Sequence, residues 1–423
     1  FHETVPMQAV HADSVTISYL FTRDDGYQDE EEYTIPILPQ GTELAEGTLG
    51  ILSDAKTVKV QSGEDEEVMV SITDNQLDIY KESVNYLTGY KYLCNEQLAS
   101  KLIGLLAYQQ YMQSKGEKVK VDKAIRPIIH RLTNHQNKHQ LWSWWGNSEN
   151  TSFWMSAHIL RALKMAQDAG YPVELNLNGL KVEYAHTRPY RGMKLEDIEI
   201  LHALHEWKVE ADYSSAIRLL EPFVRQLEQK EDSLANRNKY YRPLSYLKEK
   251  LLLWEIKQQV DSVNVGDSVR PYLKKDMLEG VYCDDGRRTY YWEGNQMINT
   301  LIAYRIIKND PSLCKLKENM QLYILRTKER GWNTYQASSA VATVLTDLLA
   351  GSGGMSGTSV SVSGKDHQRI MEFPYHARLT AGDSLLISKT GKEPLLYSVY
   401  SMKRVMNARQ SDAFKVEVTM KGK

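Results

Sequence analysis

The chain of 423 residues has only three cysteines, too few for a disulfide scaffold. It also lacks an apolar stretch long enough for a signal peptide or a membrane span. The net charge is −2 and the basic residues are scattered, so nothing indicates a nucleic-acid partner. What remains is an ordinary globular composition, 42% apolar and 25% charged, and a length that predicts two or three domains.

The odd number of cysteines leaves at least one thiol unpaired, and Cys94 suits that role. Cys283 and Cys314 could pair, and the sequence leaves this open. The chain begins at Phe1 rather than at a methionine, so we expect a mature or excised piece of a larger protein.

Both terminal parts of the chain alternate polar and apolar residues with a period of two, which is typical of half-buried strands. Turn residues (Gly, Pro and Asp) separate these segments, as in sandwich modules. The expected strands are residues 14–21, 32–38, 57–61, 67–72, 359–363, 385–388, 395–400 and 414–418. The Gly- and Ser-rich residues 350–358 have the composition of a flexible linker.

Between these parts the period becomes helical, and apolar stripes predict several buried helix faces. Three aromatic turns each lead through a polar cap into a helix, at residues 142–146, 290–295 and 331–334. Such arrays of helical hairpins often close into an α/α toroid. We therefore expect a multidomain protein in which an all-α toroid is inserted in an all-β sandwich.

Cys94 and Gln97 lie three residues apart, where an extended aromatic segment gives way to an apolar helix. At this spacing a thiol and a carboxamide on a turn can meet. Condensation with loss of ammonia would give an internal thioester, with the Gln97 carbonyl as electrophile and the Cys94 sulfur as leaving group. The alternative is that Cys94 is a small buried apolar residue, as most free cysteines are.

The turn at Cys94 resembles the thioester motif of the alpha-2-macroglobulin family, in its bacterial branch. It reads Cys-x-Glu-Gln, is preceded by Tyr-x-Tyr (Tyr90 and Tyr92) and is followed by a helix. Residues 35–39 are similar to the strand that leads from a macroglobulin-like domain toward the thioester domain. Residues 391–400 resemble the returning strand of a CUB-like domain.

The resemblance implies three structural parts. A macroglobulin-like β-segment covers residues 1–40. A discontinuous CUB-like β-sandwich covers residues 41–78 and 356–423, and its end would begin a further β-module. The thioester domain, an α/α toroid, covers residues 79–350.

The implied function is that of a protease trap, a peptidase inhibitor with endopeptidase inhibitor activity and a role in bacterial defence. Its thioester would acylate a surface amine of the target protease, with the amide formed at Gln97. The reaction is stoichiometric, so we expect no enzyme, no cofactor and no metal. Partners would be target proteases and other domains of the same longer chain. The resemblance places the protein in the periplasm or outside the cell, with a membrane anchor N-terminal to this segment as an option.

A long-lived thioester must be kept away from water. Five residues are candidates for this shield: Tyr90, Tyr92, Leu93, Trp144 and Trp145. Ordinary core packing is the alternative for each. Tyr397, Tyr400 and Met402 in the C-terminal β-segment could also cover the site. Glu96 belongs to the motif, and we expect it to position the turn rather than to act as a base.

Two positions depart from many relatives, which have Gly before the cysteine and Pro between the tyrosines. Leu93 and Lys91 stand there instead, and Leu93 argues against a turn that needs positive φ. Some relatives also carry a histidine that takes up the acyl group. No motif places one here, and the weak candidates are His158, His186, His202 and His205.

Two other readings stay open. α/α toroids also host glycoside hydrolases, which would use Asp284, Asp285 and Glu293 as acid and base. A turn is the simpler reading of the two aspartates. The chain could also be a passive binding module with a free Cys94. His135 and His139 are four residues apart, as metal ligands on a helix can be, but the polar residues between them favour a solvated loop.

Overall fold

The structure, a computed structural model, describes the chain except for several short stretches and the two ends. The described residues are 14–37, 42–52, 57–62, 67–73, 75–91, 93–114, 116–192, 194–276, 280–289, 295–328, 331–350, 359–363, 367–380, 382–390 and 395–405. The expected strand at 414–418 and the linker at 351–358 lie outside these residues.

The chain divides into two compact units, one made of residues 1–46 and 400–423 and the other of residues 47–399. In the first unit, β1 (Ser14–Thr22) pairs antiparallel with β2 (Gln28–Pro36), with Ser14 opposite Pro36. β2 begins four residues earlier than expected. The antiparallel pairing continues to Thr22 opposite Gln28. Acidic residues such as Glu31, opposite Tyr19, are therefore part of the strand although they do not fit the alternating pattern.

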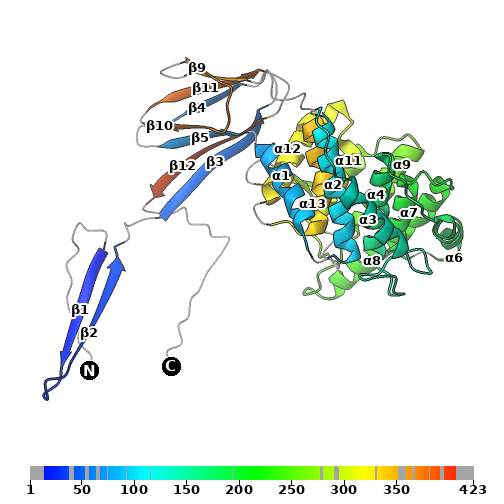
Figure 1. The fold of residues 1–423 in the computed structure, drawn as a ribbon, viewed down its shortest axis with the longest axis horizontal. Coiled ribbons are helices and arrows are strands. Elements are labelled where there is room, and N and C mark those ends of the chain that lie inside the picture. Colours follow the sequence, from blue (N-terminus) through cyan, green and yellow to red (C-terminus); the bar gives the residue numbers. More distant parts are fainter. Residues whose placement is uncertain are drawn as a thin grey trace. The chain divides into compact units, whose positions relative to one another are not determined.

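Two four-stranded sheets combine strands from before and after the helices (Figure 1). One sheet has the order β10-β5-β12-β3 and the other β4-β11-β8-β9. Their bounds are β3 Thr42–Leu52, β4 Thr57–Gln61, β5 Val68–Thr73, β8 Ser359–Ser363, β9 His367–Ile370, β10 Tyr375–Leu379, β11 Ser384–Thr390 and β12 Leu395–Val405. The printed pairs β5–β10, β4–β11, β8–β11 and β8–β9 are antiparallel.

One apolar core is shared by both sheets. It takes Ile72 and Leu395 from the first sheet and Val60, Val362 and Ile387 from the second. These residues occupy alternate positions, as in β5, where Val68, Val70 and Ile72 are buried. The period-two pattern of the sequence therefore corresponds to a real buried face.

The helices lie between β5 and β8 in the sequence. The longer ones are α1 Asn75–Gly89, α2 Asn95–Ser114, α3 Asp122–Asn134, α4 Phe153–Asp168, α7 Asp197–Glu206, α8 Tyr213–Arg237, α9 Leu247–Val260, α11 Gln296–Ile307, α12 Cys314–Thr327 and α13 Thr334–Ala340. Short elements between them are α5 Asn178–Leu180, α6 Arg188–Arg191, α10 Gly266–Val269, α14 Thr346–Ala350, β6 Leu273–Lys275 and β7 Val281–Cys283, with π-helical turns at Lys181–Thr187 and Val341–Leu345. In the described part of the chain, no helix combines the length and the apolar character that crossing a membrane requires.

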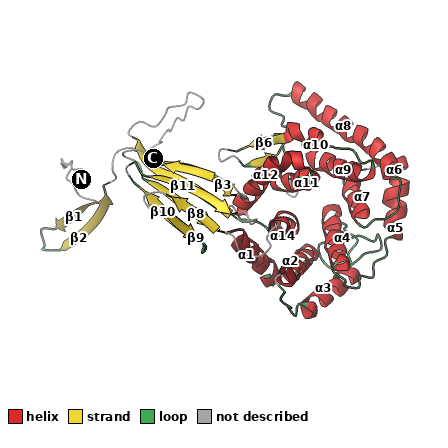
Figure 2. Ribbon diagram, turned by 90° about the horizontal axis from the view of Figure 1, so that it is seen from above, coloured by secondary structure: helices red, strands yellow, loops and turns green. Residues whose placement is uncertain are grey.

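Six of these helices follow one another as neighbours. α2 packs against α4, α4 against α7, α7 against α9, α9 against α11, and α11 against α13. α13 packs against α2, so the succession returns to its first helix. Figure 2 shows α2, α4, α7, α9 and α11 in this order. The other long helices pack on these six: α1 on α2 and α13, α3 on α2 and α4, α8 on α9, and α12 on α11.

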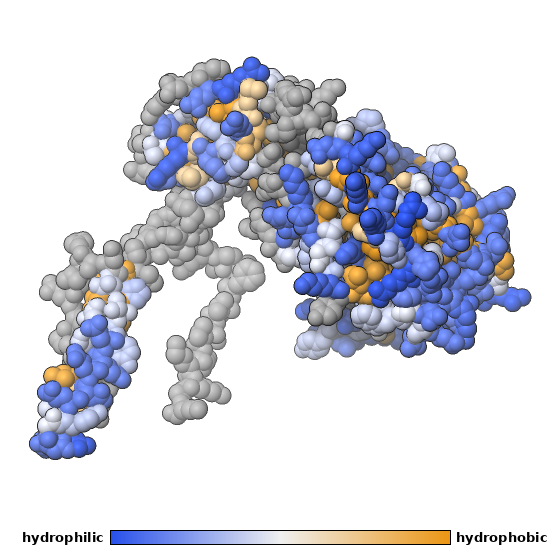
Figure 3. Space-filling model, viewed as in Figure 1, coloured by the Kyte–Doolittle hydropathy of each residue, from blue (hydrophilic) through white to orange (hydrophobic). Residues whose placement is uncertain are grey.

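The apolar stripes expected from the sequence form the core of this helical part. Leu98 and Leu102 of α2 and Met155, Ile159 and Leu163 of α4 are all buried. The polar faces of the helices give the mostly hydrophilic surface seen in Figure 3. The helices thus pack through the apolar faces that the sequence pattern predicts, and this packing supplies most of their stability.

Two of the three aromatic turns, at residues 142–146 and 331–334, lie at helix ends, whereas residues 290–294 of the other turn lie outside the described residues. Trp142 is fully buried, and its Nε1–H donates to the carbonyl of Leu132 at the end of α3, at 2.7 Å. Trp332 is buried too. Asn295 caps α11, and Asn333 caps α13 in a capping box with Gln336.

Candidate functional site

Cys94 directly precedes α2, in the N-cap position of a 20-residue helix. Its backbone N–H donates to the side-chain Oε1 of Gln97 at 3.1 Å. The backbone N–H groups of Gln97 and Glu96 lower the pKa of the Cys94 thiol as hydrogen-bond donors. This is the reciprocal geometry of a capping box, with cysteine in place of serine and glutamine at the third helical position. The spacing noticed in the sequence therefore brings the thiol and the carboxamide to the same turn.

Cys94 is buried, with only 3% of the residue exposed. Burial raises the pKa of this thiol, the N–H groups at the start of the helix lower it, and the nearby Glu96 carboxyl raises it further. The net direction is upward, so as a free thiol it is held in its neutral form. N–H groups at the start of a helix would also stabilise a thiolate at this position.

Glu96 points into the protein rather than toward solvent, and it is 4% exposed. Its Oε1 accepts a hydrogen bond from Ser100 Oγ at 2.7 Å, and its Oε2 accepts one from Thr334 Oγ1 at 2.8 Å. Burial raises the pKa of the Glu96 carboxyl, and the two hydroxyl donors only partly offset this effect. Glu96 thus ties the first turn of α2 to the start of α13, which agrees with a positioning role.

Ser100 lies one helical turn further along α2 and connects to two more helices. Its Oγ is 3.0 Å from His158 Nε2 on α4 and 3.0 Å from Ser338 Oγ on α13. His158 is fully buried, and burial together with the charge of Arg161 lowers its pKa to about 3, so the ring is neutral. The result is a buried polar cluster directly beneath the Cys94–Gln97 turn.

Asn95 holds the other side of the turn. Its Nδ2 donates to the carbonyls of Ser143 and Gly146, at 2.8 and 3.0 Å. Its Oδ1 lies 2.6 Å from Nδ1 of His135, and its backbone N–H donates to the carbonyl of Trp144 at 3.0 Å. Three of these contacts fix the 142–146 turn against the start of α2, and the fourth joins it to His135 at the end of α3.

The two tryptophans expected in the shield differ. Trp144 is 44% exposed, and its ring meets Trp154 edge-on at 5.7 Å; Trp154 in turn meets Tyr335 at 5.2 Å. Tyr335 packs against His158 at 4.9 Å, so an aromatic series runs from the surface to the buried cluster. Trp145 is 63% exposed and has no such ring contact among the described residues. Packing therefore connects the ring of Trp144, rather than that of Trp145, to the buried cluster through Trp154 and Tyr335.

The residues before the motif also lie beside the helical core. Tyr90 is half-buried, with its ring 6.0 Å from that of Tyr86. The carbonyl of Leu93 accepts a hydrogen bond from Arg131 Nη2 at 3.4 Å. Lys91 is exposed. Tyr92 lies outside the described residues.

The remaining histidines are not at this turn. His186 is exposed in the π-helical turn before α6, and His205 packs against Tyr213. His202 lies between Glu206 and Glu255 in a buried ionic network. His135 contacts Asn95 instead of pairing with His139, and in the described ranges no group of three or more His, Cys, Asp and Glu residues is arranged to hold a metal.

The carboxylates of the hydrolase reading serve a turn. Asp285 accepts hydrogen bonds from Ser245 Oγ at 2.8 Å and from the N–H of Arg287 at 3.1 Å. Asp284 pairs with Lys274 Nζ at 2.9 Å. Glu293 lies outside the described residues. These contacts favour the turn over a pair of carboxylates free to act as acid and base.

The cysteines and the C-terminal tyrosines also have defined places. All three thiols are free: Cys94 and Cys283 are buried, and Cys314 is exposed. Tyr397 belongs to the apolar core shared by the two sheets, so its ring packs there rather than over the motif. Tyr400 is 43% exposed, and the side chain of Met402 lies outside the described set.

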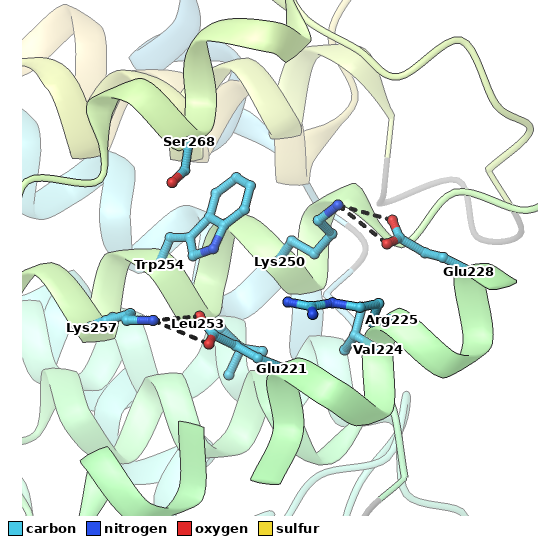
Figure 4. A pocket seen from close by; sticks show the side chains of 9 residues that line it. All are labelled: Glu221, Val224, Arg225, Glu228, Lys250, Leu253, Trp254, Lys257 and Ser268. Atoms are coloured by element: carbon cyan, nitrogen blue, oxygen red, sulfur yellow. Dashed lines mark hydrogen bonds and ion pairs between the residues drawn. The ribbon is translucent and has the colours of Figure 1, made fainter. Parts of the chain in front are cut away.

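A separate cavity of about 320 Å³ lies between α8, α9 and α10. Figure 4 shows Lys250 directed at Glu228 and Lys257 directed at Glu221, with Trp254 between the two pairs. Because these charges are already paired and no residue of the 94–97 turn lines the cavity, it does not form part of the candidate site.

Sequence reasoning missed the polar residues that support the turn: Ser100, His135, Thr334 and Ser338. The only local signal was a serine on the otherwise apolar inner face of α2. The contact partners of this serine come from positions 58 and 238 residues away in the chain. Such distant pairs have no mark in a single sequence.

No family model matches this sequence, and no curated protein matches it. Two solved structures are similar in fold. Trypsin-activated alpha-2-macroglobulin from Escherichia coli matches 94% of this chain at 14% identity, with a TM-score of 0.56. The E. coli alpha-2-macroglobulin activated by porcine elastase matches 90% of it at 14% identity, with a TM-score of 0.52. The chain spans 27% and 34% of those two chains. It therefore shares the multidomain fold, helices combined with antiparallel sheets, of part of a bacterial alpha-2-macroglobulin.

Proposed function

We propose that this chain is the thioester-bearing part of a protease-trapping protein of the alpha-2-macroglobulin type. In this proposal, Cys94 and Gln97 form the internal thioester. The observation that carries it is the contact between the two residues at the start of α2, where the Cys94 N–H donates to Gln97 Oε1 at 3.1 Å. The similarity in fold to two E. coli alpha-2-macroglobulins supports it.

The proposed chemistry has two balanced steps. In the first, the Cys94 thiol adds to the Gln97 carboxamide and ammonia leaves, which gives the thioester. In the second, an amine of the target attacks the Gln97 carbonyl carbon, the carbon–sulfur bond breaks, and the amine proton ends on the Cys94 sulfur. The helix N–H groups at the sulfur favour departure of the thiolate. Each chain reacts once, so the protein is proposed to be a stoichiometric inhibitor and not an enzyme.

We also propose that the helical part is an α/α toroid and that the two sheets form a CUB-like sandwich. The return of the helix succession from α13 to α2 supports the first statement. The core shared by both sheets, and their strands from both sides of the helical part, support the second. β1 and β2 would belong to a macroglobulin-like domain.

The partners in this proposal are target proteases, held covalently through Gln97, and further domains of a longer chain. A periplasmic or exported location and a role in bacterial defence follow from the same proposal. The surface amine of a lysine is the expected nucleophile. Among the described residues, the two histidine rings that lie near the turn are already engaged, His158 with Ser100 and His135 with Asn95, and neither is placed as an acyl carrier.

The test is the intact mass of freshly purified protein before and after methylamine, with free thiols counted in parallel. The proposal expects a starting mass short by one ammonia, then a gain of methylamine and the release of one thiol that peptide mapping assigns to Cys94. Cys94→Ser is the matched control, and it should have the full mass and take up no methylamine. A wild-type mass equal to that of the sequence, with Cys94 titratable from the start, would contradict the proposal. Repeating the measurement with flanking domains attached would separate a motif that never forms the bond from one that loses it to water.

A further inference from the structure

The polar cluster beneath the motif contains an unusual atom. His158 Nδ1 is buried and has no hydrogen-bond partner in the part of the chain that the structure describes. Its other ring nitrogen, Nε2, is 3.0 Å from Ser100 Oγ. Because buried polar atoms are nearly always paired, this unpaired end of the ring calls for an explanation.

The number of protons shared by Glu96, Ser100 and His158 explains the unpaired Nδ1. Ser100 has a single hydroxyl proton but lies within hydrogen-bond distance of both Glu96 Oε1, at 2.7 Å, and His158 Nε2, at 3.0 Å. When Glu96 is ionised, the hydroxyl must donate to the carboxylate, and Ser100 Oγ then accepts from a proton on His158 Nε2. When Glu96 carries a proton on Oε1, that proton goes to Ser100, whose own hydroxyl then donates to a bare Nε2.

The two states place the ring proton differently. With Glu96 ionised, the neutral ring of His158 carries its proton on Nε2; with Glu96 protonated, the proton is on Nδ1. Only the unpaired Nδ1 can change between bare and protonated without disturbing a partner. The unpaired atom is therefore what allows the chain of hydrogen bonds to reverse its direction.

We propose that Ser100 and His158 are positioning residues of the thioester site: with Glu96 they form a reversible hydrogen-bonded chain that sets the charge beside Cys94. This inference rests on the proposed function for its consequence but not for its geometry. The charge matters because a carboxylate next to Cys94 opposes the negative charge that the sulfur gains as it leaves. A neutral Glu96 lets the thiolate depart more easily than an ionised one.

The surroundings of Glu96 contain few other charges. No described basic side chain forms an ion pair with it. The cations nearby act on its neighbours: Arg161 on His158, Lys248 on Tyr335, and Arg131 through the carbonyl of Leu93. The groups that face the chain are Cys94 on α2, Tyr86 on α1, His158 and Arg161 on α4, and Thr334, Tyr335 and Ser338 on α13. Burial raises the pKa of the Glu96 carboxyl, and the hydroxyls of Ser100 and Thr334 are the groups that oppose this shift.

The direct test measures the tautomer of His158 as a function of pH. NMR of protein labelled with ¹³C and ¹⁵N in histidine reports which ring nitrogen carries the proton. The His158 signals are assigned by their loss in a His158→Gln variant. The proposal expects a proton on Nδ1 at low pH and on Nε2 at high pH, with one midpoint. In Glu96→Gln, which has no carboxyl to titrate, the tautomer should not change with pH. An unchanged tautomer in the wild type, or the same transition in Glu96→Gln, would overturn the proposal.

Ser100 supplies the matched pair of variants. Ser100→Ala should break the coupling, so that His158 no longer responds to pH, whereas Ser100→Thr keeps a hydroxyl and should restore the response. Loss of one of two hydroxyl donors should also raise the ionisation midpoint of Glu96 by about one to two pH units. A purely structural role for Ser100 would change stability but would leave the tautomer transition in place.

The functional arm measures thiol release by methylamine against pH, at a fixed concentration of unprotonated amine. The wild type should react faster below the Glu96 midpoint than above it, and Glu96→Gln should lose this step. If no thioester is present in the wild type, the proposed function fails, but the tautomer experiment still decides the present inference. If the thioester is present and the rate shows no step, the inference fails alone.

Discussion

Nδ1 of His135 lies 2.6 Å from Oδ1 of Asn95, the residue between Cys94 and Glu96. Because Oδ1 is an acceptor, the His135 ring must carry a proton on Nδ1. This contact joins the end of α3 to the start of α2, and the Nδ2 of Asn95 joins the same point to the carbonyls of Ser143 and Gly146. Asn95 is therefore the side chain through which the turn at Cys94 is held from outside.

Asn95→Ala should destabilise the protein by about 1–3 kcal/mol, because it leaves buried partners without hydrogen bonds. It should also speed spontaneous loss of the proposed thioester, since the turn would no longer be fixed. Urea unfolding measures the first effect, and thiol release in buffer alone measures the second. Asn85→Ala, at an exposed position of α1, is the matched control and should change stability by less than about 0.5 kcal/mol. Equal effects of the two changes would contradict this account of Asn95.

The ionic network on α4, α7, α9 and α11 predicts a dependence of stability on pH. Nε2 of His202 is 2.9 Å from Glu255, and its Nδ1 is 3.6 Å from Glu206; Arg161 and Arg305 complete the network. Burial alone would lower the pKa of His202, but the two carboxylates outweigh it and raise this pKa above its usual value. Only the protonated ring can donate to both carboxylates.

The sign follows from linkage. A histidine whose pKa is higher in the folded state contributes its full stabilisation below its unfolded pKa of about 6.5 and loses it as pH rises through the folded value. His202→Gln should therefore cost more stability at pH 6 than at pH 9. Chemical unfolding of both proteins at several pH values measures this difference. A cost that is constant with pH would show that the imidazolium does not bridge the carboxylates.

These cases show what a single sequence can supply. The Cys94–Gln97 spacing, the polar caps at Asn295 and Asn333 and the apolar stripes are local patterns, and the structure has a helix start, two caps and buried faces at these places. Each of these features depends on residues within one turn of one another, which propensity and periodicity can capture.

The support of the site could not be predicted in the same way. Ser100 meets His158 and Ser338 only because α2 packs against both α4 and α13. These meetings depend on the order in which helices neighbour one another, and no residue pattern in α2 specifies it. From the sequence alone, Trp144 and Trp145 are equal candidates for the shield, although only the ring of Trp144 packs against Trp154.

The two tryptophans give a matched test of the proposed shield. Trp144→Ala should increase the rate of spontaneous thioester hydrolysis by about two- to tenfold, because it removes the outer member of the aromatic series that leads to His158. Trp145→Ala removes a ring of the same size that is mostly exposed, and it should leave the rate unchanged. The measurement is the time course of thiol release without added amine. If thiol release were faster in Trp145→Ala than in Trp144→Ala, the assignment of the shield to Trp144 would be wrong.

Asn333 offers a test of whether the start of α13 matters to the site. Its side chain accepts the N–H of Gln336, and the Gln336 side chain accepts the N–H of Asn333, so both orphan donors at the start of this short helix are paired. Asn333→Ala should cost about 1 kcal/mol of stability, and Asn333→Ser should restore most of it. Because the next residue, Thr334, donates to Glu96, fraying of this turn should also remove a donor from that carboxyl and raise its midpoint. The His158 tautomer transition should accordingly move to higher pH in Asn333→Ala and return in Asn333→Ser. A loss of stability without any movement of the transition would mean that Thr334 keeps its place at Glu96 independently of the cap.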